Sequence, residues 1–232
     1  MATGDKPGGN PRAILPRAIL PRAILFDWDN TLIDSWPTIL DALNTTFEAF
    51  DMAPWSMIEA RERVRHSMRD SFPKLFRDRW EEAGEVFYQR YADIHVKKLR
   101  PLAGAEKMLE FLTDAGIYLG VVSNKKGDFL RHEAKHLGWD RFFGALVGAL
   151  DAKKDKPDPE VVDLALADTG IERGPDVWLA GDADIDLECA HNAKCLPILI
   201  REQAPGPGEL QSHPPARHFR DCDALCKFII NM

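Results

Sequence analysis

Cysteine and long hydrophobic runs are scarce in this chain and an excess of positive charge is missing, and each shortage argues against a class of protein. The 232 residues include four cysteines, which form no Cys-x-x-Cys pair and have no His-rich neighbour, so a zinc site is not expected. The longest apolar run, residues 142–150, is too short to span a bilayer. The formal net charge of -7 does not favour binding to nucleic acid. We therefore expect no nucleic-acid partner and no membrane partner.

The N-terminal region repeats Pro-Arg-Ala-Ile-Leu three times, at 11–15, 16–20 and 21–25. Pro and Arg interrupt every apolar triplet, so the region contains no signal-peptide-like apolar segment, and its five-residue period is too short for a solenoid. The third copy leads into the first predicted strand. We expect residues 1–20 to form an extended or disordered arm, with an interaction role and a duplication artefact both left open. Without a secretion signal, we expect reduced cysteines and a cytoplasmic protein.

Strand-like and helix-like apolar patterns alternate along most of the chain, which is typical of an α/β fold. Two of the strand candidates are nearly all apolar, which suits strands covered on both faces of a parallel sheet. Pro at a helix start and Gly just past a helix end mark the helices between the strands. The predicted strands are 23–27, 117–122, 145–149, 177–181 and 197–200, and the predicted helices are 104–115, 128–137 and 159 to about 170, with a short final strand and helix after the loop at 204–215.

Residues 35–100 interrupt this alternation. They contain no convincing strand, and Pro54, Pro73 and Pro101 divide them into what we predict to be three or four helices. We interpret them as an insertion between the first strand and the rest of the core.

The composition of this insertion leaves two interpretations open. Residues 56–80 carry seven Lys and Arg against four Asp and Glu, a surface that would attract an anionic substrate. The alternative is a solvated helix face with pairs such as Glu59 and Arg63, which are four residues apart. We expect the aromatic residues of the insertion to form its core rather than a platform for substrate; these are Trp36, Trp55, Phe72 and Trp80.

Polar clusters follow four of the predicted strands. Because the carboxyl ends of parallel strands lie at the same edge of a sheet, all four clusters should converge there. Several acids, a Lys and a Ser at one edge indicate a site for a divalent cation and a phosphate. The clusters are Asp27/Asp29/Thr31, Ser123-Asn124-Lys125, Lys156-Pro157-Asp158-Pro159 and Gly181-Asp182-Ala183-Asp184-Ile185-Asp186.

These side chains suit phosphoryl chemistry. Mg²⁺ prefers oxygen ligands, which the carboxylates of Asp27 and Asp182 and the backbone carbonyl of Asp29 could supply. Asp186 would orient bound water or Lys156. A carboxylate can attack phosphorus to form an aspartyl-phosphate, and a second acid can donate a proton to the leaving oxygen and then activate water. Ser123, backbone N–H groups and Lys156 would hold the phosphoryl oxygens.

The four clusters resemble the motifs of haloacid-dehalogenase-like (HAD) phosphatases. The pattern hhhhDxDxT is present as residues 23–31, the Ser/Thr motif as 121–124, the Lys motif as 156–159 and the acidic motif GDxxxD as 181–186. The motifs occur in the family's order over about 23 to 200. Residues 26–36, 101–105 and 121–125 look most like the phosphoglycolate-phosphatase-like branch.

The resemblance implies a fold and a set of roles. The fold would be a Rossmann-like parallel-sheet core of residues 21–34 and 101–232 with an inserted helical cap (C1 type) at 35–100. The activity would be Mg²⁺-dependent hydrolysis of a small phosphorylated metabolite, with phosphoglycolate as the best guess. Asp27 would be the nucleophile and Asp29 the general acid/base; Ser123, Asn124 and Lys156 would bind phosphate; Asp27, Asp29 and Asp182 would hold the metal; Thr31 and Asp186 would support them.

Several alternatives stay open at this point. A phosphomutase would use the same fold, whereas the acid at position 29 argues against a dehalogenase, and the intact motifs argue against a catalytically silent interaction protein. Asp184 competes with Asp186 for the supporting role, although the spacing favours Asp186. We prefer Lys156 to Lys153 and Lys154, and we expect Thr31 to bond to neighbouring backbone. The substrate and the oligomeric state cannot be determined from the sequence.

Overall fold

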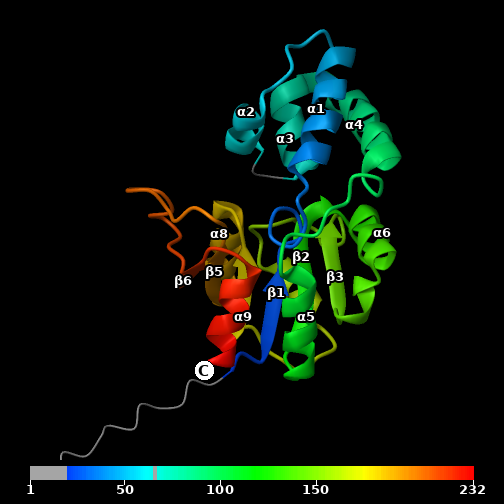
Figure 1. Cartoon of the computed structure of the whole chain (residues 1–232). Helices are drawn as coiled ribbons and strands as arrows, with labels where there is room; N and C mark the ends of the chain where they lie inside the picture. The colour runs from blue at the N-terminus through cyan, green and yellow to red at the C-terminus, as the bar shows by residue number, and fades with distance from the viewer. Residues whose placement is uncertain (1–19, 65–66) are drawn as a thin grey trace, which may run out of the picture.

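A six-stranded parallel sheet forms the centre of the computed structural model, which describes residues 20–64 and 67–232 (Figure 1). The predicted N-terminal arm therefore lies outside the described residues except for Leu20. The strand order is β3-β2-β1-β4-β5-β6. The strands are β1 Ala23–Phe26, β2 Tyr118–Lys126, β3 Ala145–Ala149, β4 Val177–Gly181, β5 Leu196–Ile200 and β6 Arg217–Phe219.

The strand order explains where a site can form. From β1 the chain first adds β2 and β3 on one side of the sheet and later adds β4, β5 and β6 on the other side. The direction in which strands are added therefore reverses between β1 and β4, which are paired at Phe26 and Ala180. In open α/β sheets, ligands bind beyond the carboxyl ends of the strands at such a reversal. The predicted α/β fold with a parallel Rossmann-like sheet is confirmed.

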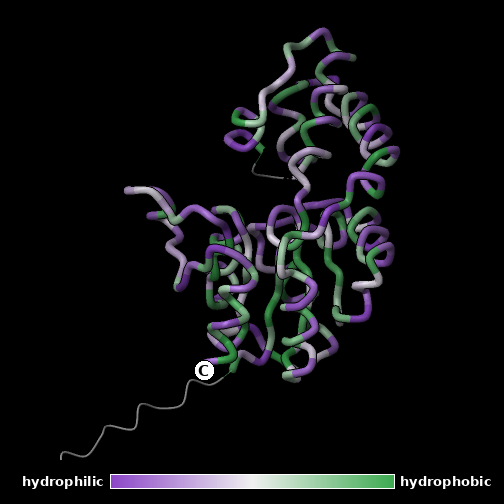
Figure 2. Tube along the Cα trace, in the orientation of Figure 1, coloured by the Kyte–Doolittle hydropathy of each residue, from purple (hydrophilic) through white to green (hydrophobic). Residues whose placement is uncertain are grey.

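Helices cover both faces of the sheet. One apolar cluster joins the sheet to α5, α6 and α9, and a second joins it to α7 and α8. Figure 2 shows the apolar strands inside and the polar helix surfaces outside. These helices are α5 Ala105–Asp114, α6 Gly127–Leu137, α7 Glu160–Leu166, α8 Asp184–Asn192 and α9 Cys222–Ile230, with a short 3₁₀ turn at Trp139–Arg141.

Four further helices lie above the carboxyl edge of the sheet in Figure 1, and we call them the cap. They have an apolar cluster of their own, centred on Phe47, Phe72 and Phe76. The cap helices are α1 Trp36–Ala49, α2 Met57–Arg63, α3 Met68–Phe76 and α4 Trp80–Ile94, with a 3₁₀ turn at Arg77–Arg79. The exact domain boundaries stay a prediction.

Local sequence explains several of these ends. Pro37 occupies the first turn of α1, where its missing N–H costs nothing. Ser56 and Glu59 form a reciprocal capping box at the start of α2. Gly138 ends α6 in the left-handed conformation. Within the described part of the chain, no helix is both long enough and apolar enough to cross a membrane.

The second strand is longer than predicted. It continues from Val122 through Lys126, whereas the apolar pattern predicts an end at residue 122. A register shift between Val122 and Lys126 lets the polar end pair again with β3 at Ala149. Apolar periodicity cannot detect such an extension, because the added residues are polar and face the site.

Candidate active site

The carboxyl edge of the sheet brings Asp27, Lys156 and Asp186 into direct contact. Asp27 directly follows β1, Lys156 lies in the loop before α7, and Asp186 is in the first turn of α8. The Lys156 ammonium donates to Asp27 Oδ1 at 2.8 Å and to Asp186 Oδ1 at 2.6 Å. The lysine is 2% exposed and Asp27 is 7% exposed. A buried ammonium is thus paired with two carboxylates that are 129 and 30 residues distant along the chain.

Asp182 adds a third carboxylate beside this pair. One carboxylate oxygen each of Asp27, Asp182 and Asp186 lies within 4.8 Å of the others. Burial raises the pKa of the Asp27 carboxyl to about 6. Asp186 and Asp29 also raise this pKa, whereas Lys156 lowers it. Burial and the neighbouring Asp186 and Asp27 raise the pKa of Asp182 well above its usual value. Three clustered acids of this kind fit a hard divalent cation.

The backbone at Gly181 and Ala183 fixes Asp186. A Cβ at Gly181 would lie 2.2 Å from Asp186 Cγ, so only glycine permits this close approach. The second carboxylate oxygen of Asp186 accepts from the Ala183 N–H at 3.0 Å. The carboxylate is therefore held from two sides, and its first oxygen is directed at Lys156.

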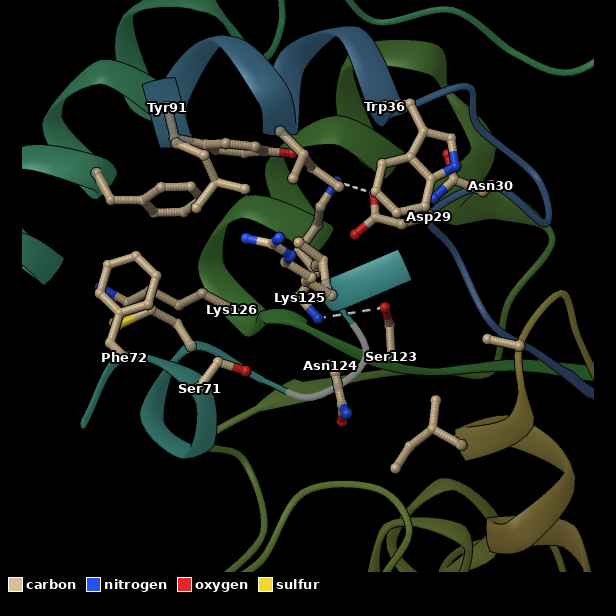
Figure 3. Close-up of a pocket in the computed structure, with 18 of the residues that line it drawn as sticks. Asp29, Asn30, Trp36, Ser71, Phe72, Tyr91, Ser123, Asn124, Lys125 and Lys126 are labelled. Atoms are coloured by element: carbon tan, nitrogen blue, oxygen red, sulfur yellow. Dashed lines mark hydrogen bonds and ion pairs between the residues drawn. The ribbon is translucent and has the colours of Figure 1, made fainter. Parts of the chain in front are cut away.

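Asn124 holds the loop that carries Lys156. Its side-chain oxygen accepts from the Lys156 N–H at 3.0 Å, and its NH₂ donates to the Lys156 carbonyl at 3.2 Å. Ser123 is buried at the same strand end, and its hydroxyl accepts from the Lys125 N–H at 3.3 Å (Figure 3). The family resemblance assigns Asn124 to phosphate, which stays a prediction; in the structure its side chain bonds to the lysine loop, and the residue lines the cavity.

Two side chains hold Asp29. Ser35 donates a short hydrogen bond to Asp29 Oδ1, and the Lys125 ammonium lies 2.6 Å from the same oxygen (Figure 3). Burial alone would lower the pKa of Lys125, but Asp29, Tyr91 and Glu133 raise it well above its usual value. Lys125 is therefore a cation in this site, and it fixes the position of the second acid.

Lys125 is in turn held by Glu133, a residue that the sequence analysis missed. Glu133 is fully buried on α6, and its Oε2 accepts from Lys125 at 2.7 Å and from the Trp28 indole at 2.7 Å. Its Oε1 accepts from the Tyr91 hydroxyl at 3.2 Å and lies 2.9 Å from His95 Nδ1. Burial works against ionisation, yet Lys125 and the hydrogen bonds lower the pKa of Glu133.

This buried network joins the cap to the core. Tyr91 belongs to cap helix α4 and His95 directly follows it, whereas Trp28 and Lys125 belong to the core.

A glutamate inside the helical pattern at 127–137 gives one usable sequence signal, because it falls on the apolar face with Leu130 and Ala134. A charge on a buried face needs a partner.

Other predicted residues take less central positions. The Thr31 hydroxyl is buried and has no hydrogen-bond partner among the described residues, so the expected bond to neighbouring backbone is absent. Asp184 lies 3.6 Å from His213 and outside the three-acid group, which leaves the position beside Lys156 to Asp186. Lys153 and Lys154 are exposed, and Lys154 pairs with Asp158 at 3.6 Å.

A cavity of about 520 Å³ extends from these residues into the cap. Phe72 and Trp55 belong to the cap cluster, as predicted, and together with Trp36 they also line this cavity. The fourth aromatic residue, Trp80, packs against the cap cluster as expected. The cap cluster therefore borders the cavity.

Comparisons with known proteins agree with this geometry. Residues 24–200 match the model of the family described as haloacid dehalogenase-like hydrolase. The phosphoglycolate phosphatase of Rhodobacter capsulatus is 29% identical over 212 residues, covering 87% of this chain and 93% of that protein. The pyrophosphatase PpaX of Halalkalibacterium halodurans is 28% identical over 169 residues, covering 73% and 78%. A hydrolase from Pseudomonas syringae shares the fold, with a TM-score of 0.78, 21% identity and coverage of 91% and 99%.

The parallel sheet with this acid–lysine edge, together with the phosphatase relatives, identifies a hydrolase of phosphorylated substrates. The chain belongs to the haloacid dehalogenase-like hydrolase family. The resemblance drawn from the four motifs, including its phosphoglycolate-phosphatase-like branch, is confirmed, as is the prediction that the protein is an enzyme of the phosphoric monoester hydrolase class.

Proposed function

We propose that this enzyme is a Mg²⁺-dependent phosphatase that hydrolyses a small phosphorylated metabolite through an aspartyl-phosphate on Asp27. The observation that carries the proposal is the contact of Asp27 with Lys156 at 2.8 Å, beside the carboxylates of Asp182 and Asp186. A nucleophile, a phosphate-binding cation and cation ligands thus occupy one buried edge.

The cation would be held by the carboxylates of Asp27 and Asp182 and the backbone carbonyl of Asp29. When bound, Mg²⁺ supplies positive charge that offsets the repulsion between an anionic carboxylate and a phosphate. The clustered acids support this role, because Lys156 alone leaves an excess of negative charge among them.

In the first half-reaction, an Asp27 oxygen attacks phosphorus while the bond from phosphorus to the ester oxygen breaks. Asp29 donates its proton to that leaving oxygen, so the alcohol departs neutral. Lys156, Ser123 and nearby backbone N–H groups hold the phosphoryl oxygens, where negative charge concentrates in the transition state. Ser35 and Lys125 keep the Asp29 side chain in place for this proton transfer.

In the second half-reaction, Asp29 accepts a proton from a water molecule as the water oxygen attacks phosphorus. The bond between phosphorus and Asp27 breaks, which releases inorganic phosphate and restores both carboxyl groups to their starting states. Asp186 contributes by holding the Lys156 ammonium at 2.6 Å throughout the cycle.

The mechanism is tested with p-nitrophenyl phosphate, with and without EDTA, on wild type and Asp27→Asn. We expect EDTA to abolish turnover and the variant to lose on the order of 10³-fold or more in kcat. Asp114→Asn, at an exposed end of α5, is the control and should keep full activity. Acid quenching with ³²P-labelled substrate should leave a hydroxylamine-labile label on the peptide that contains Asp27. Sustained turnover by Asp27→Asn would contradict the mechanism.

Product analysis separates the phosphatase from a phosphomutase. A phosphatase releases one inorganic phosphate for each ester consumed, whereas a mutase returns a phosphate isomer of the substrate. Phosphoglycolate is the reference compound, because the relative from Rhodobacter capsulatus is named for it. A cytoplasmic location also stays part of the proposal.

A further inference from the structure

The cavity above Asp27 is much larger than a two-carbon phosphate requires. Its volume is about 520 Å³, within the range of about 300–1,000 Å³ that is typical of small-molecule sites. Cavities of this size hold drug-sized ligands, which bury most of their surface against apolar and aromatic side chains. Phosphoglycolate has only a carboxymethyl group beyond the phosphate, so most of this space would stay filled with water around it.

The cavity is polar at the sheet edge and mostly apolar beyond it. Asp27, Ser123 and Lys156 lie at the sheet edge, and the cap and α6 contribute mainly apolar and aromatic side chains, together with polar ones at Arg63, Ser71, Lys74 and Lys126. The aromatic and aliphatic side chains that we use in the argument are Trp36, Leu43, Phe72, Phe87, Tyr88 and Phe129.

The volume does not result from a cap that has swung away from the core. On one side of the cavity, Tyr91 donates to Glu133, and the rings of Tyr88 and Phe129 are 5.7 Å apart. On the other side, Arg69 Nε of α3 lies 2.7 Å from the buried Asp155 carboxylate of the lysine loop. The cap thus contacts the core on both sides while the cavity persists.

The cations near the phosphate end already have partners. Lys125 is paired with Asp29 at 2.6 Å and with Glu133 at 2.7 Å. The neighbouring Lys126 ammonium lies over the Tyr88 ring, 4.9 Å from its centre. Lys125 would have to give up one of its two carboxylates to bind a second negative group close to the phosphate. Lys74 also lines the cavity, but on the exposed surface of α3.

We propose that the preferred substrate is a phosphate monoester of an alcohol with a bulky apolar body, which the cap side of the cavity buries. The proposal rests on the phosphatase function above and narrows its substrate class. The phosphate would lie between Asp27 and Lys156, and the apolar body would lie among the cap side chains and Phe129. Such esters should be better substrates than phosphoglycolate.

The n-alkyl phosphates test this proposal directly, because ethyl, butyl, hexyl and octyl phosphate share nearly the same leaving-group chemistry. We expect kcat/KM of the wild-type enzyme with Mg²⁺ to rise by up to about fourfold per added methylene. Hexyl phosphate should therefore exceed both ethyl phosphate and phosphoglycolate by at least about tenfold. A flat or falling series, or a tenfold preference for phosphoglycolate, would overturn the inference and leave the phosphatase proposal standing.

Two variants localise the effect. Phe129→Ala should flatten the alkyl series, measured as the ratio of kcat/KM for hexyl phosphate to that for ethyl phosphate, whereas Phe129→Leu should retain most of the series. Phe142→Ala is the matched control, because Phe142 packs against the core cluster and does not line the cavity. An undiminished series in Phe129→Ala would contradict the placement of the apolar body. If the wild type hydrolyses none of these esters, nor p-nitrophenyl phosphate, the phosphatase proposal itself fails.

Discussion

At the scale of single residues, the site places more negative charge together than Lys156 can neutralise. Asp27, Asp182 and Asp186 lie within 4.8 Å of one another, and the pKa values of the first two are raised. Folding the metal-free protein at neutral pH therefore carries an electrostatic penalty. Functional sites often retain such penalties, because chemistry rather than stability selects their residues.

Asp27→Asn should stabilise the metal-free protein at neutral pH. The folded state holds a proton on Asp27 up to a pKa of about 6, against 3.8 for an ordinary Asp, so ionising this group above pH 6 disfavours folding. The variant should gain up to about 3 kcal/mol in the free energy of unfolding at pH 7.5, and the gain should shrink as the pH falls through 6 towards 4. Urea unfolding in EDTA at pH 7.5 and 4.5 measures this difference.

The control for this measurement is Asp114→Asn, whose carboxyl is exposed at the end of α5. It should change the free energy of unfolding little and equally at both pH values. A variant at Asp27 that is no more stable than wild type at pH 7.5 would show that the penalty is absent.

Glu133 differs from Asp27, because the groups that contact its buried carboxylate offset the cost of burying the negative charge. Lys125, Trp28, Tyr91 and His95 all contact its carboxylate. Glu133→Gln should lower the free energy of unfolding by about 3–5 kcal/mol, because it leaves the buried ammonium of Lys125 with one partner fewer. Denaturant unfolding at pH 7.5 checks this value. Glu110→Gln, on the exposed face of α5, should cost less than about 0.5 kcal/mol, and an equal effect of both substitutions would refute the role of Glu133.

At the scale of elements, the end of β2 is held by an unusually close approach of β3 to the start of α6. A Cβ at Gly148 would lie 2.5 Å from the Gly127 Cα and 2.6 Å from the Lys125 carbonyl oxygen. These are backbone atoms, so no side chain can rotate away to make room. The same segment carries Ser123 and Asn124, which ties the packing of β3 to the geometry of the site.

Gly148→Ala should therefore reduce both stability and activity. Overpacking of this kind typically costs about 1–3 kcal/mol, and the shift of the β2 end should lower kcat by at least about tenfold. Thermal unfolding and p-nitrophenyl phosphate turnover measure the two effects. Gly206→Ala, where the added Cβ would meet its nearest atom at an ordinary 3.8 Å, should leave both unchanged. Full activity in Gly148→Ala would show that the strand end can move freely.

At the scale of the whole molecule, two contacts of different kinds dock the cap. Tyr91 and His95 reach Glu133 beside the linker that follows α4, and Arg69 reaches Asp155 across the cavity. Asp155 is buried and directly precedes Lys156, so the position of the cap and the position of Lys156 are linked. Cap closure of this kind commonly completes a catalytic site and excludes water.

Arg69→Met should weaken this link while it keeps an apolar stem. We expect kcat/KM for p-nitrophenyl phosphate to fall by about tenfold and the free energy of unfolding to fall by about 1–3 kcal/mol, because the buried Asp155 carboxylate loses its cation. Arg79→Met is the control, since Arg79 pairs with Glu82 on an exposed surface of the cap. Unaltered kinetics in Arg69→Met would show that the contact is incidental to catalysis.

The sequence by itself determined which residues stand at the ends of the strands. Apolar strands followed by Asp27 and by Asp182 place both acids at one sheet edge, because the carboxyl ends of parallel strands coincide there. Motif spacing also selected Lys156 and Asp186, which the structure places in contact at 2.6 Å. These inferences succeed because they depend on neighbours in the chain and on one general property of parallel sheets.

Only the tertiary structure decided how those residues are supported. Glu133 meets Trp28 across 105 residues and Tyr91 across 42, and no local pattern encodes such a meeting. The bond of Asn124 to the lysine loop and the opening of the cap cluster onto the cavity likewise depend on how separate elements pack. Local sequence determines which element each residue joins, whereas its contacts depend on packing between distant segments, which a single sequence does not reveal.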